Sequence, residues 1–380
     1  MQFVNSSPFA SDYTMAVDKA GRERVVVVAK GTYAIPSLAN QAPSLLAEQV
    51  PLVTGDVFGG EPGASAVVNE NDFAAVKPRC DVLLNGSCYA PSGRTATQVM
   101  VALRVGELTK SFRVTGRRHY RSGLLTTTLS APEPFSVLKL GYELAYGGVD
   151  RDSADPASHA WYPLNHVGVG FYPNADGNSL RDKPAACTEE LEQSANRPNG
   201  RYKPMAFGPV GRAWQQRIRW AGTYDQKWLD EQFPFLPLDF DDRYFQSAPE
   251  DQQIDYPRGG DSVALLNLTP QGRTLFKLPP DLRLPVLFLG RDDSLTEVAA
   301  VVDTLLLEPD DGRFMLVWRA SIPLRRNIRE IAEVRVGQSA AQLERQREHQ
   351  LRMRGKRRFL SLAEAVNWKT EMRRVAARRT

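Results

Sequence analysis

Residues 301–323, VVDTLLLEPDDGRFMLVWRASIP, decide the fold of this 380-residue chain. Two apolar runs of strand length flank residues 309–312, a Pro-Asp-Asp-Gly sequence of the kind that forms tight turns. The stretch therefore predicts a β-hairpin in which residues 304–307 pair with residues 314–318.

Further segments of strand length occur on both sides of this hairpin. Residues 24–35, RVVVVAKGTYAI, are rich in β-branched side chains, as strands are. The unbroken valines at 25–28 indicate burial on both faces, which is typical of a central strand. The other segments are DVLLNGSCYAP (81–91), TQVMVALRVGE (97–107), LTKSFRVTGRR (108–118), SVALLNLTP (262–270), RTLFKLP (273–279), LPVLFLG (284–290) and residues 333–337.

The spacing of these segments predicts an antiparallel β-sandwich or barrel-like scaffold. No helix-length segments separate the strands, so a doubly wound α/β fold is not expected. Asn85-Gly86 lies between apolar runs and predicts a two-residue hairpin turn. The expected fold is therefore mainly β, with few short helices and a C-terminal helical tail.

Composition divides the chain into four regions. Residues 149–212 lack periodicity and are rich in Asp, Pro, Asn and Gly, so they form a long irregular stretch. The expected regions are an N-terminal β region (1–148), a loop-rich central region with short helices and an aromatic segment (149–258), a C-terminal β region packed with the first (259–338) and a basic helical tail (339–380).

Residues 211–253 gather three of the six tryptophans and six further aromatic residues. One short helix is expected around Trp214 and ends at Gly222. A second is expected to begin at a capping box of Thr223 and Gln226 and to end before Pro234. So many large apolar side chains either anchor a core or make a binding surface, and we expect packing ahead of partner contact.

The net charge of +4 conceals an uneven distribution. Residues 341–380 carry twelve Lys/Arg and four Asp/Glu, so the rest of the chain is net negative. A basic tail can contact nucleic acid or an acidic partner. Only Phe359 and Trp368 accompany these basic residues, which makes nucleic-acid binding the weaker hypothesis. We expect a solvated amphipathic helix.

The cysteines and the chain start indicate the compartment. Cys80, Cys88 and Cys187 are odd in number and lack CxxC spacing, which argues against a disulfide framework. The first residues lack a basic region and contain Pro8, unlike a signal peptide. Apolar stretches fall far short of the ~20 residues of a membrane span. The sequence therefore predicts a cytoplasmic protein with no membrane contact.

Motifs for nucleotide or hydrolase chemistry are absent from the sequence. It contains no GxxxxGK[ST], GxSxG or HExxH, and Gly168-Val-Gly170 lacks the third glycine of a dinucleotide fingerprint. His159 and His166, with the acidic residues at 150–155, match no metal-ligand pattern. We expect no cofactor, no metal and no catalytic residue.

Asp239, Asp241 and Glu250 are the strongest candidates for carboxylate chemistry. A carboxylate-dependent hydrolase needs two such groups facing one cleft, about 5–10 Å apart. Arg212, Arg219 or Arg243 offers ion pairs instead, so a structural network is the favoured interpretation and a hydrolase the alternative. Separate ion pairs for these side chains would remove the case for a hydrolase.

Four segments carry a resemblance to a known family. They are PFSVLKLGYELAYGGVD (134–150), NHVGVGF (165–171), AGTYDQKWLDEQFPFLPLDFDDRYFQSAPEDQQ (221–253) and LLLEPDDGRFMLVWRASIPLRRNIREI (305–331). They resemble the bacterial domain of unknown function found beside type VI secretion effector genes, over most of residues 1–340. The recurring Asn-Pro-Val-Gly sequence of that family is Asn165-His166-Val167-Gly168 here.

The resemblance implies a non-enzymatic adaptor or chaperone. Proteins similar to this one hold a toxic effector through a PAAR-like tip domain and help load it onto the VgrG spike. Candidates for partner contact follow from residue type, because aromatic and arginine side chains dominate interface hot spots. With two neighbouring carboxylates, they are Trp228, Phe235, Asp239, Asp241, Arg243, Tyr244 and Phe245.

Overall fold

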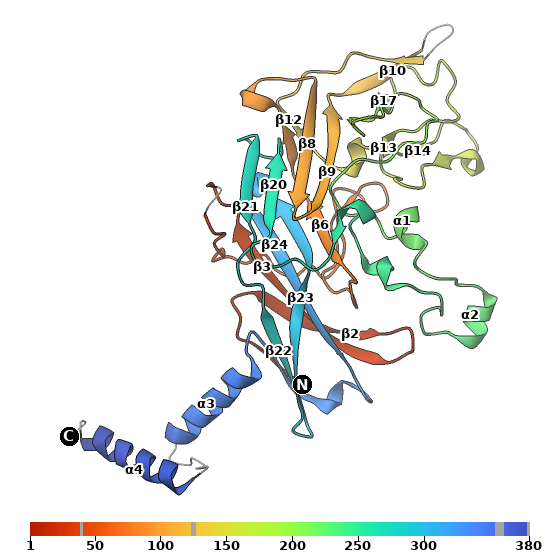
Figure 1. Ribbon diagram of the computed structural model, residues 1–380. Helices are drawn as coiled ribbons and strands as arrows, with labels where there is room; N and C mark the ends of the chain where they lie inside the picture. Colours follow the sequence, from red (N-terminus) through yellow and green to blue (C-terminus); the bar gives the residue numbers. More distant parts are fainter. Residues whose placement is uncertain (39–40, 123–126, 354–360, 378–380) are drawn as a thin grey trace.

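The computed structural model describes residues 1–38, 41–122, 127–353 and 361–377 (Figure 1). Strands hold 37% of the residues and helices 15%, which confirms a mainly β fold. Two sheets dominate the structure, and several two- and three-stranded sheets accompany them.

The first sheet has nine strands and contains the hairpin that the sequence predicts. Its main path runs β1-β25-β22-β23-β24-β3-β2, and β6 and β19 pair off this path. The strands are β1 (Gln2–Asn5), β2 (Ala10–Val17), β3 (Glu23–Ala34), β6 (Cys80–Leu84), β19 (Gln253–Ile254), β22 (Leu284–Gly290), β23 (Leu295–Glu308), β24 (Arg313–Pro323) and β25 (Ile331–Val336).

The β23–β24 hairpin lies at the middle of this path. Leu305 pairs with Leu316 and Leu307 with Phe314, and the turn holds a 3₁₀ segment, Pro309–Asp311, before Gly312. Strand β3 lies between β24 and β2 and pairs antiparallel with both. Its valines at 25–28 are buried on both faces, which confirms the central position predicted from the unbroken apolar run.

The ends of the first sheet approach each other, so the sheet is nearly closed like a barrel. Strand β1 pairs parallel with β25 at one end, and β2 forms the other end. The ring of Phe3 on β1 lies 5.6 Å from the ring of Tyr13 on β2. This contact joins the two end strands through side chains, without a backbone ladder between them.

The second sheet is antiparallel and has the order β18-β9-β8-β20-β21. Its strands are β8 (Gln98–Val105), β9 (Leu108–Thr115), β18 (Thr188–Glu189), β20 (Ser262–Leu266) and β21 (Arg273–Lys277). Alternate residues of β8 are buried, the pattern of a strand with one face toward a core. Figure 1 shows this sheet beyond one end of the long strands β3, β23 and β24.

One hydrophobic core joins the two sheets. Buried side chains of β3, β23 and β24 belong to the same cluster as buried side chains of β8, β9, β20 and β21. Both sheets also combine strands from residues 1–148 with strands from residues 259–338. The two β regions therefore share their sheets as well as their core.

The central region, residues 149–258, contains short helices and some strands of the small sheets, whose other strands belong to residues 1–148. The small sheets contain β4 (Val57–Phe58) with β5 (Val67–Asn69), β7 (Ser87–Tyr89) with β12 (Val137–Lys139), β10 (Arg118–Ser122) with β11 (Thr127–Leu129) and β17 (Pro184–Ala185), β13 (Tyr146–Gly147) with β16 (Val169–Gly170), and β14 (Val149–Asp150) with β15 (Ala160–Trp161). The α-helices here are α1 (Gln215–Ile218) and α2 (Gln226–Glu231).

The prediction of a hairpin turn at Asn85-Gly86 is wrong. Strand β6 pairs with β23 on one side and β19 on the other, so neither edge is open to β7. Strand β7 pairs with β12 instead. Asn85 uses its side-chain amide to donate to the Val68 carbonyl at 2.9 Å, which ties this bend to a distant loop.

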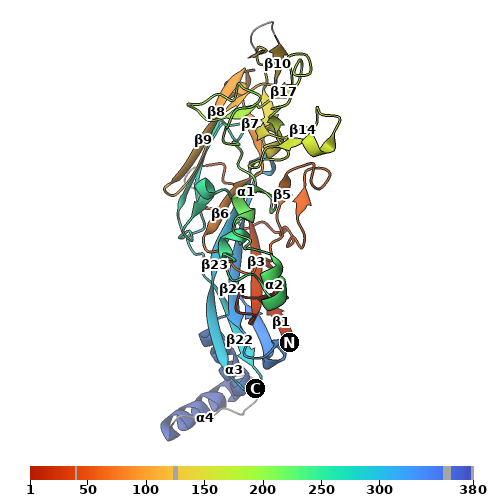
Figure 2. The ribbon, with the colours of Figure 1, turned by 90° about the vertical axis from the view of Figure 1, so that its right-hand side faces the viewer.

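The C-terminal tail contains two helices, α3 (Ala340–Met353) and α4 (Leu362–Ala377). Figure 2 shows an elongated molecule with this tail at one end and β10 and β17 at the other. Buried Leu343 and a hydrogen bond from the Ala340 amide to Glu297 attach α3 to the barrel. The Glu364 amide donates to Ser361 Oγ at 3.2 Å, which caps the start of α4. Across the described ranges, no helix is long and apolar enough to cross a membrane.

Candidate functional site

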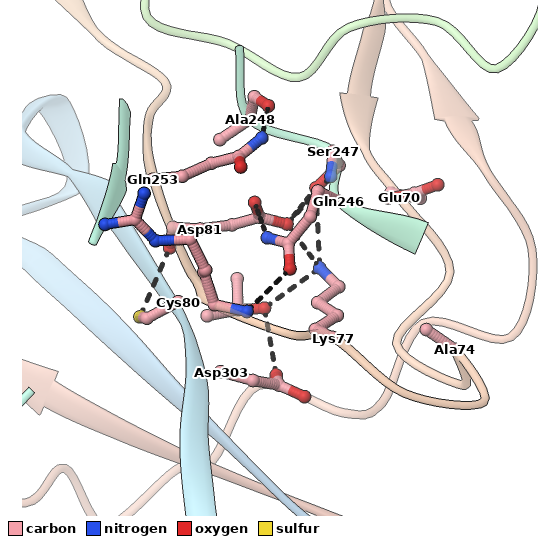
Figure 3. A network of polar contacts seen from close by, with 12 residues as sticks. Glu70, Ala74, Lys77, Cys80, Asp81, Gln246, Ser247, Ala248, Gln253 and Asp303 are labelled. Carbon is pink, nitrogen blue, oxygen red and sulfur yellow. Dashed lines mark hydrogen bonds and ion pairs between the residues drawn. The ribbon is translucent and has the colours of Figure 1, made fainter. Parts of the chain in front are cut away.

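The aromatic segment, residues 211–253, lies over the side of the barrel sheet (Figure 2) and is called the clasp below. Its last part is tied to the barrel by a buried acid, Asp81 of β6. Asp81 accepts hydrogen bonds from Gln246 Nε2 at 2.6 Å, from the Ser247 amide at 2.8 Å and from Ser247 Oγ at 3.0 Å. Figure 3 shows these side chains meeting between β6 and the clasp.

Lys77 neutralises this buried carboxylate. Its Nζ lies 2.7 Å from Asp81 Oδ2 and 3.1 Å from Thr304 Oγ1 on β23. Burial lowers the pKa of Lys77, but the nearby negative charges of Asp81, Glu70 and Asp303 outweigh burial and leave the pKa above its ordinary value. The ammonium therefore stays charged, and the network holds strand and clasp together electrostatically.

Two further buried side chains fix the clasp at its ends. Gln252 donates from Nε2 to the carbonyls of Val82 and Phe207 at 2.7 and 2.9 Å. Arg217 of α1 donates to Glu70 at 2.8 Å and to the Tyr244 carbonyl at 2.8 and 3.0 Å. These contacts make the clasp a fixed part of the scaffold.

The start of α2 differs from the predicted capping box. Asp225 caps the helix by accepting from the Trp228 amide at 2.8 Å. The Thr223 hydroxyl is engaged elsewhere, because it donates to Asp239 at 2.7 Å. Gly222 ends the preceding turn with a positive φ of 81°, where an added Cβ would lie 2.8 Å from Pro237.

Each carboxylate of the predicted hydrolase set has its own partner. Asp239 accepts from the amide and hydroxyl of Thr223, Asp241 binds Arg243 through two bonds of 2.9 and 2.7 Å, and Glu250 pairs with Arg219. The structure therefore distributes these groups among separate contacts.

The pKa shifts of two of these acids also argue against a hydrolase. Hydrogen bonds from Thr223 lower the pKa of Asp239, and hydrogen bonds from Arg243 lower the pKa of Asp241. A general acid needs a pKa raised toward the working pH. These two carboxylates thus serve as braces of the clasp, and the geometry lends the hydrolase alternative no support.

The outer part of the clasp exposes large apolar side chains. Six of them fall within residues 218–238, and Leu238 and Phe233 are 77% and 62% exposed. The full set is Ile218, Tyr224, Leu229, Phe233, Phe235 and Leu238. This set is called the apolar surface below. Trp214 and Phe240 are buried, so the expectation that packing dominates holds only for part of the segment.

An apolar groove of about 510 Å³ adjoins this surface. Its lining comes from α1, from the turn that follows and from the 3₁₀ segment Asp242–Phe245. The lining residues are Arg212, Ala213, Ile218, Ala221, Gly222, Tyr224, Leu236, Phe240, Tyr244 and Phe245. A hollow of this size and composition suits an apolar side chain or a short apolar segment.

The predicted contact residues take different places in the clasp. Tyr244 and Phe245 line the apolar groove. Trp228 is half-buried, and its indole N–H donates to the Phe235 carbonyl at 2.9 Å, which holds the loop after α2. The Phe235 ring lies against Gly21, where an added Cβ would be 3.0 Å from it. Arg243 is exposed, and its guanidinium lies 3.4 Å from the Trp220 ring centre.

Sequence reasoning missed much of the exposed set. Ile218, Tyr224, Leu229, Phe233 and Leu238 are not among the predicted contact residues, although they are exposed. Only Ile218 and Leu229 of this set lie in helices, of four and six residues, so helical periodicity could not separate the exposed side chains from the buried ones.

Metal and disulfide chemistry find no site in the described part of the chain. There, no group of three or more His, Cys, Asp or Glu could hold a metal ion. All three cysteines are buried and free. Burial raises the pKa of Cys88 to about 12, so this thiol is not an activated nucleophile.

Fold and clasp together define a mainly β scaffold protein with a fixed, partly exposed aromatic segment. The chain belongs to the family described as "Uncharacterized protein conserved in bacteria (DUF2169)", whose model matches residues 20–319. The clasp lies wholly inside the matched residues, and the helical tail lies outside them. The family description names no activity and no partner. No curated protein and no solved structure matches the chain.

Proposed function

We propose that this protein is a non-enzymatic adaptor or chaperone that binds a type VI secretion effector through its PAAR-like tip domain and helps load it onto the VgrG spike. The link to a type VI secretion system rests on the resemblance carried by residues 134–150, 165–171, 221–253 and 305–331. The apolar surface of the clasp carries the binding part of the proposal, because exposed apolar patches on soluble scaffolds mark interaction sites.

The rigidity of the clasp supports a binding role. A surface that is already held in place loses little conformational entropy when a partner docks. Asp81, Lys77 and Gln252 hold the base of the clasp by buried hydrogen bonds, while its tip remains exposed. The site thus combines a fixed base with exposed aromatic side chains, the residue types that dominate interface hot spots.

Co-expression with the effector encoded beside this chain tests the proposal. We expect the tagged protein to retain the effector through size-exclusion chromatography as one complex. The same effector expressed alone is expected to yield less soluble material, because its apolar docking segment is then uncovered. Failure of wild-type protein to retain any neighbouring effector or spike protein would contradict the proposed function.

A further inference from the structure

A basic pocket of about 310 Å³ adjoins α1, beside the apolar groove. Helix α1 and the turn after it contribute to both hollows: Ile218 and Ala221 line the apolar groove, whereas Gln216, Arg219 and Trp220 line the basic pocket. Five cationic side chains and two carboxylates line the basic pocket. They are Lys110, Lys203, Arg217, Arg219 and Arg243, with Glu250 and Asp251.

Two ammonium groups share one carboxylate in this pocket. Asp251 Oδ1 lies 3.2 Å from Lys110 Nζ, and Asp251 Oδ2 lies 2.8 Å from Lys203 Nζ. Arg219 and Arg243 pair with Glu250 and Asp241. Arg217 pairs with Glu70, which it shares with Arg212, and Arg212 has a second carboxylate in Asp56. The lysine pair thus leaves one positive charge without a counterion inside the pocket.

Lys110 of β9 forms the buried end of this pair. Its side chain is 3% exposed, and its Nζ donates to Gln252 Oε1 at 2.6 Å and to Asp251. An ammonium has three N–H donors, so one remains for a ligand after these two bonds. Burial lowers the pKa of Lys110 to about 8, against the opposing effect of Asp251. An added anion would relieve that cost.

Arg219 and Arg243 can rearrange at little cost in free energy when a ligand binds. Arg219 and Arg243 lie 4.8 and 3.4 Å from the centre of the Trp220 ring, which holds both guanidiniums at the pocket mouth. Their ion pairs with Glu250 and Asp241 are about half exposed, and exposed pairs contribute only about 0–1 kcal/mol. An incoming carboxylate can therefore share these donors.

An unused acceptor complements the donors. Gln216 lines the same pocket, and its Oε1 is buried without a hydrogen-bond partner in the described structure. Its amide nitrogen donates to the Leu164 carbonyl at 2.8 Å, which fixes the orientation of the side chain. The pocket thus offers cationic donors for an anion, and an amide oxygen without a hydrogen-bond partner is buried beside it.

We infer that the basic pocket receives a carboxylate of the bound protein, from an acidic side chain or the chain end, while the apolar groove receives its apolar neighbours. One uncompensated positive charge matches one carboxylate, whereas a phosphate brings a charge of nearly −2 at neutral pH. This assignment rests on the proposed function, since it names the chemistry of the same partner.

Two further acidic residues near Lys110 and Lys203 line a different hollow. Glu190 and Glu192 line a neighbouring hollow of about 430 Å³, which shares Lys110, Lys203 and Asp251 with the basic pocket. Neither glutamate lies within ion-pair distance of a lysine in the described structure. Neither glutamate lines the basic pocket itself.

Titration of Lys110 by NMR tests the pocket on the protein alone. The probe is N-acetylglycine, which carries a carboxylate and an N–H, and the matched control is uncharged N-acetylglycinamide at equal ionic strength. We expect N-acetylglycine to raise the pKa of Lys110 above its value of about 8, because a nearby opposite charge favours the charged form. The amide should leave it unchanged. Two results would contradict the proposed pocket. One is that N-acetylglycine does not raise the pKa of Lys110 in the wild-type protein, and the other is that it raises this pKa equally in the Lys203→Gln/Arg243→Gln protein.

Effector affinity tests the source of the carboxylate. Lys203 and Arg243 are about half exposed, so Lys203→Gln/Arg243→Gln protein should fold normally and bind the effector about tenfold more weakly. Arg283→Gln, which removes an exposed ion pair outside the clasp, should bind as wild type does. Full affinity in the double variant, with N-acetylglycine still binding to wild type, would assign the pocket to a free carboxylate and overturn the partner assignment. Failure of wild type to bind any effector contradicts the proposed function, and the N-acetylglycine titration still decides the pocket.

Discussion

Gln246 and Asp81 are 165 positions apart in sequence, yet Gln246 Nε2 donates to Asp81 Oδ1 at 2.6 Å inside the protein. Asp81 belongs to β6 at the centre of the fold, and Gln246 belongs to the clasp. This buried acid thereby connects the scaffold with the candidate binding surface, as Gln252 and Arg217 also do. The attachment of this part of the clasp consequently depends on the charge of Asp81.

Asp81→Asn tests this dependence. The substitution keeps the shape of the side chain but leaves the Lys77 ammonium buried without its anion, which costs about 3–5 kcal/mol for a buried pair. The free energy of unfolding from urea titration should fall by about that amount. Asp255→Asn is the matched control, because Asp255 is 99% exposed and pairs with Arg79 at 3.4 Å. Equal losses for both variants would contradict the role of Asp81.

The β23–β24 hairpin predicts a second stability effect. Leu316 is fully buried opposite Leu305, and Leu316→Ala leaves a cavity in the core that the two sheets share. Such truncations cost about 2–5 kcal/mol. Met15→Ala on the end strand β2 removes a side chain that is 39% exposed and should cost less than 1 kcal/mol. A loss for Leu316→Ala no larger than that for Met15→Ala would place the hairpin outside the core.

The central strands were predictable because their signals are local. The turn at residues 309–312 and the valine run at 25–28 specify a hairpin and a strand buried on both faces without any knowledge of distant segments. The prediction of a hairpin at Asn85-Gly86 failed because strand pairing there depends on distant segments. The turn propensity of this dipeptide is real, but pairing of β6 with β23 and β19 leaves β7 no edge to join.

The candidate site was predictable only in outline. The density of aromatic residues identified residues 211–253 as a candidate site. Which of its side chains are exposed depends on where the wall of the barrel ends, and no local sequence pattern encodes that. The roles of Asp81 and Lys77 had no sequence signal, since their partners lie in the clasp and on β23. Asp239 and Asp241 showed only that carboxylates gather here, while their hydrogen bonds to Thr223 and Arg243 required coordinates.

The apolar surface predicts a loss of binding without a loss of stability. Phe233→Ser/Leu238→Ser removes two exposed side chains, so the free energy of unfolding should change by less than about 1 kcal/mol. Effector affinity should drop about tenfold or more, as for truncated hot spots. Met100→Thr, an exposed apolar change on the outer face of β8, serves as control and should bind normally. Unchanged affinity in the double variant would remove the apolar surface from the interface.

Lys110 predicts a pH dependence of stability. Burial lowers the pKa of Lys110 to about 8, whereas the ordinary value, reached in the unfolded chain, is 10.5. Between these values the unfolded chain binds one more proton than the folded chain, so stability rises with pH. Below pH 8 both states are protonated, and the cost of burying the charge is fully present. The gain between pH 8 and 10.5 amounts to at most about 3 kcal/mol.

Comparison with Lys110→Met isolates this gain, because the other titratable groups are present in both proteins. The free energy of unfolding of wild type minus that of Lys110→Met should increase steadily from pH 7.5 to pH 10.5 in urea titrations. Asp251 stays ionised throughout, since Lys110 and Lys203 outweigh its burial and hold its pKa below the ordinary value. A difference that is flat or falls with pH would show that Lys110 keeps an ordinary pKa in the folded protein and that the basic pocket holds no desolvated charge.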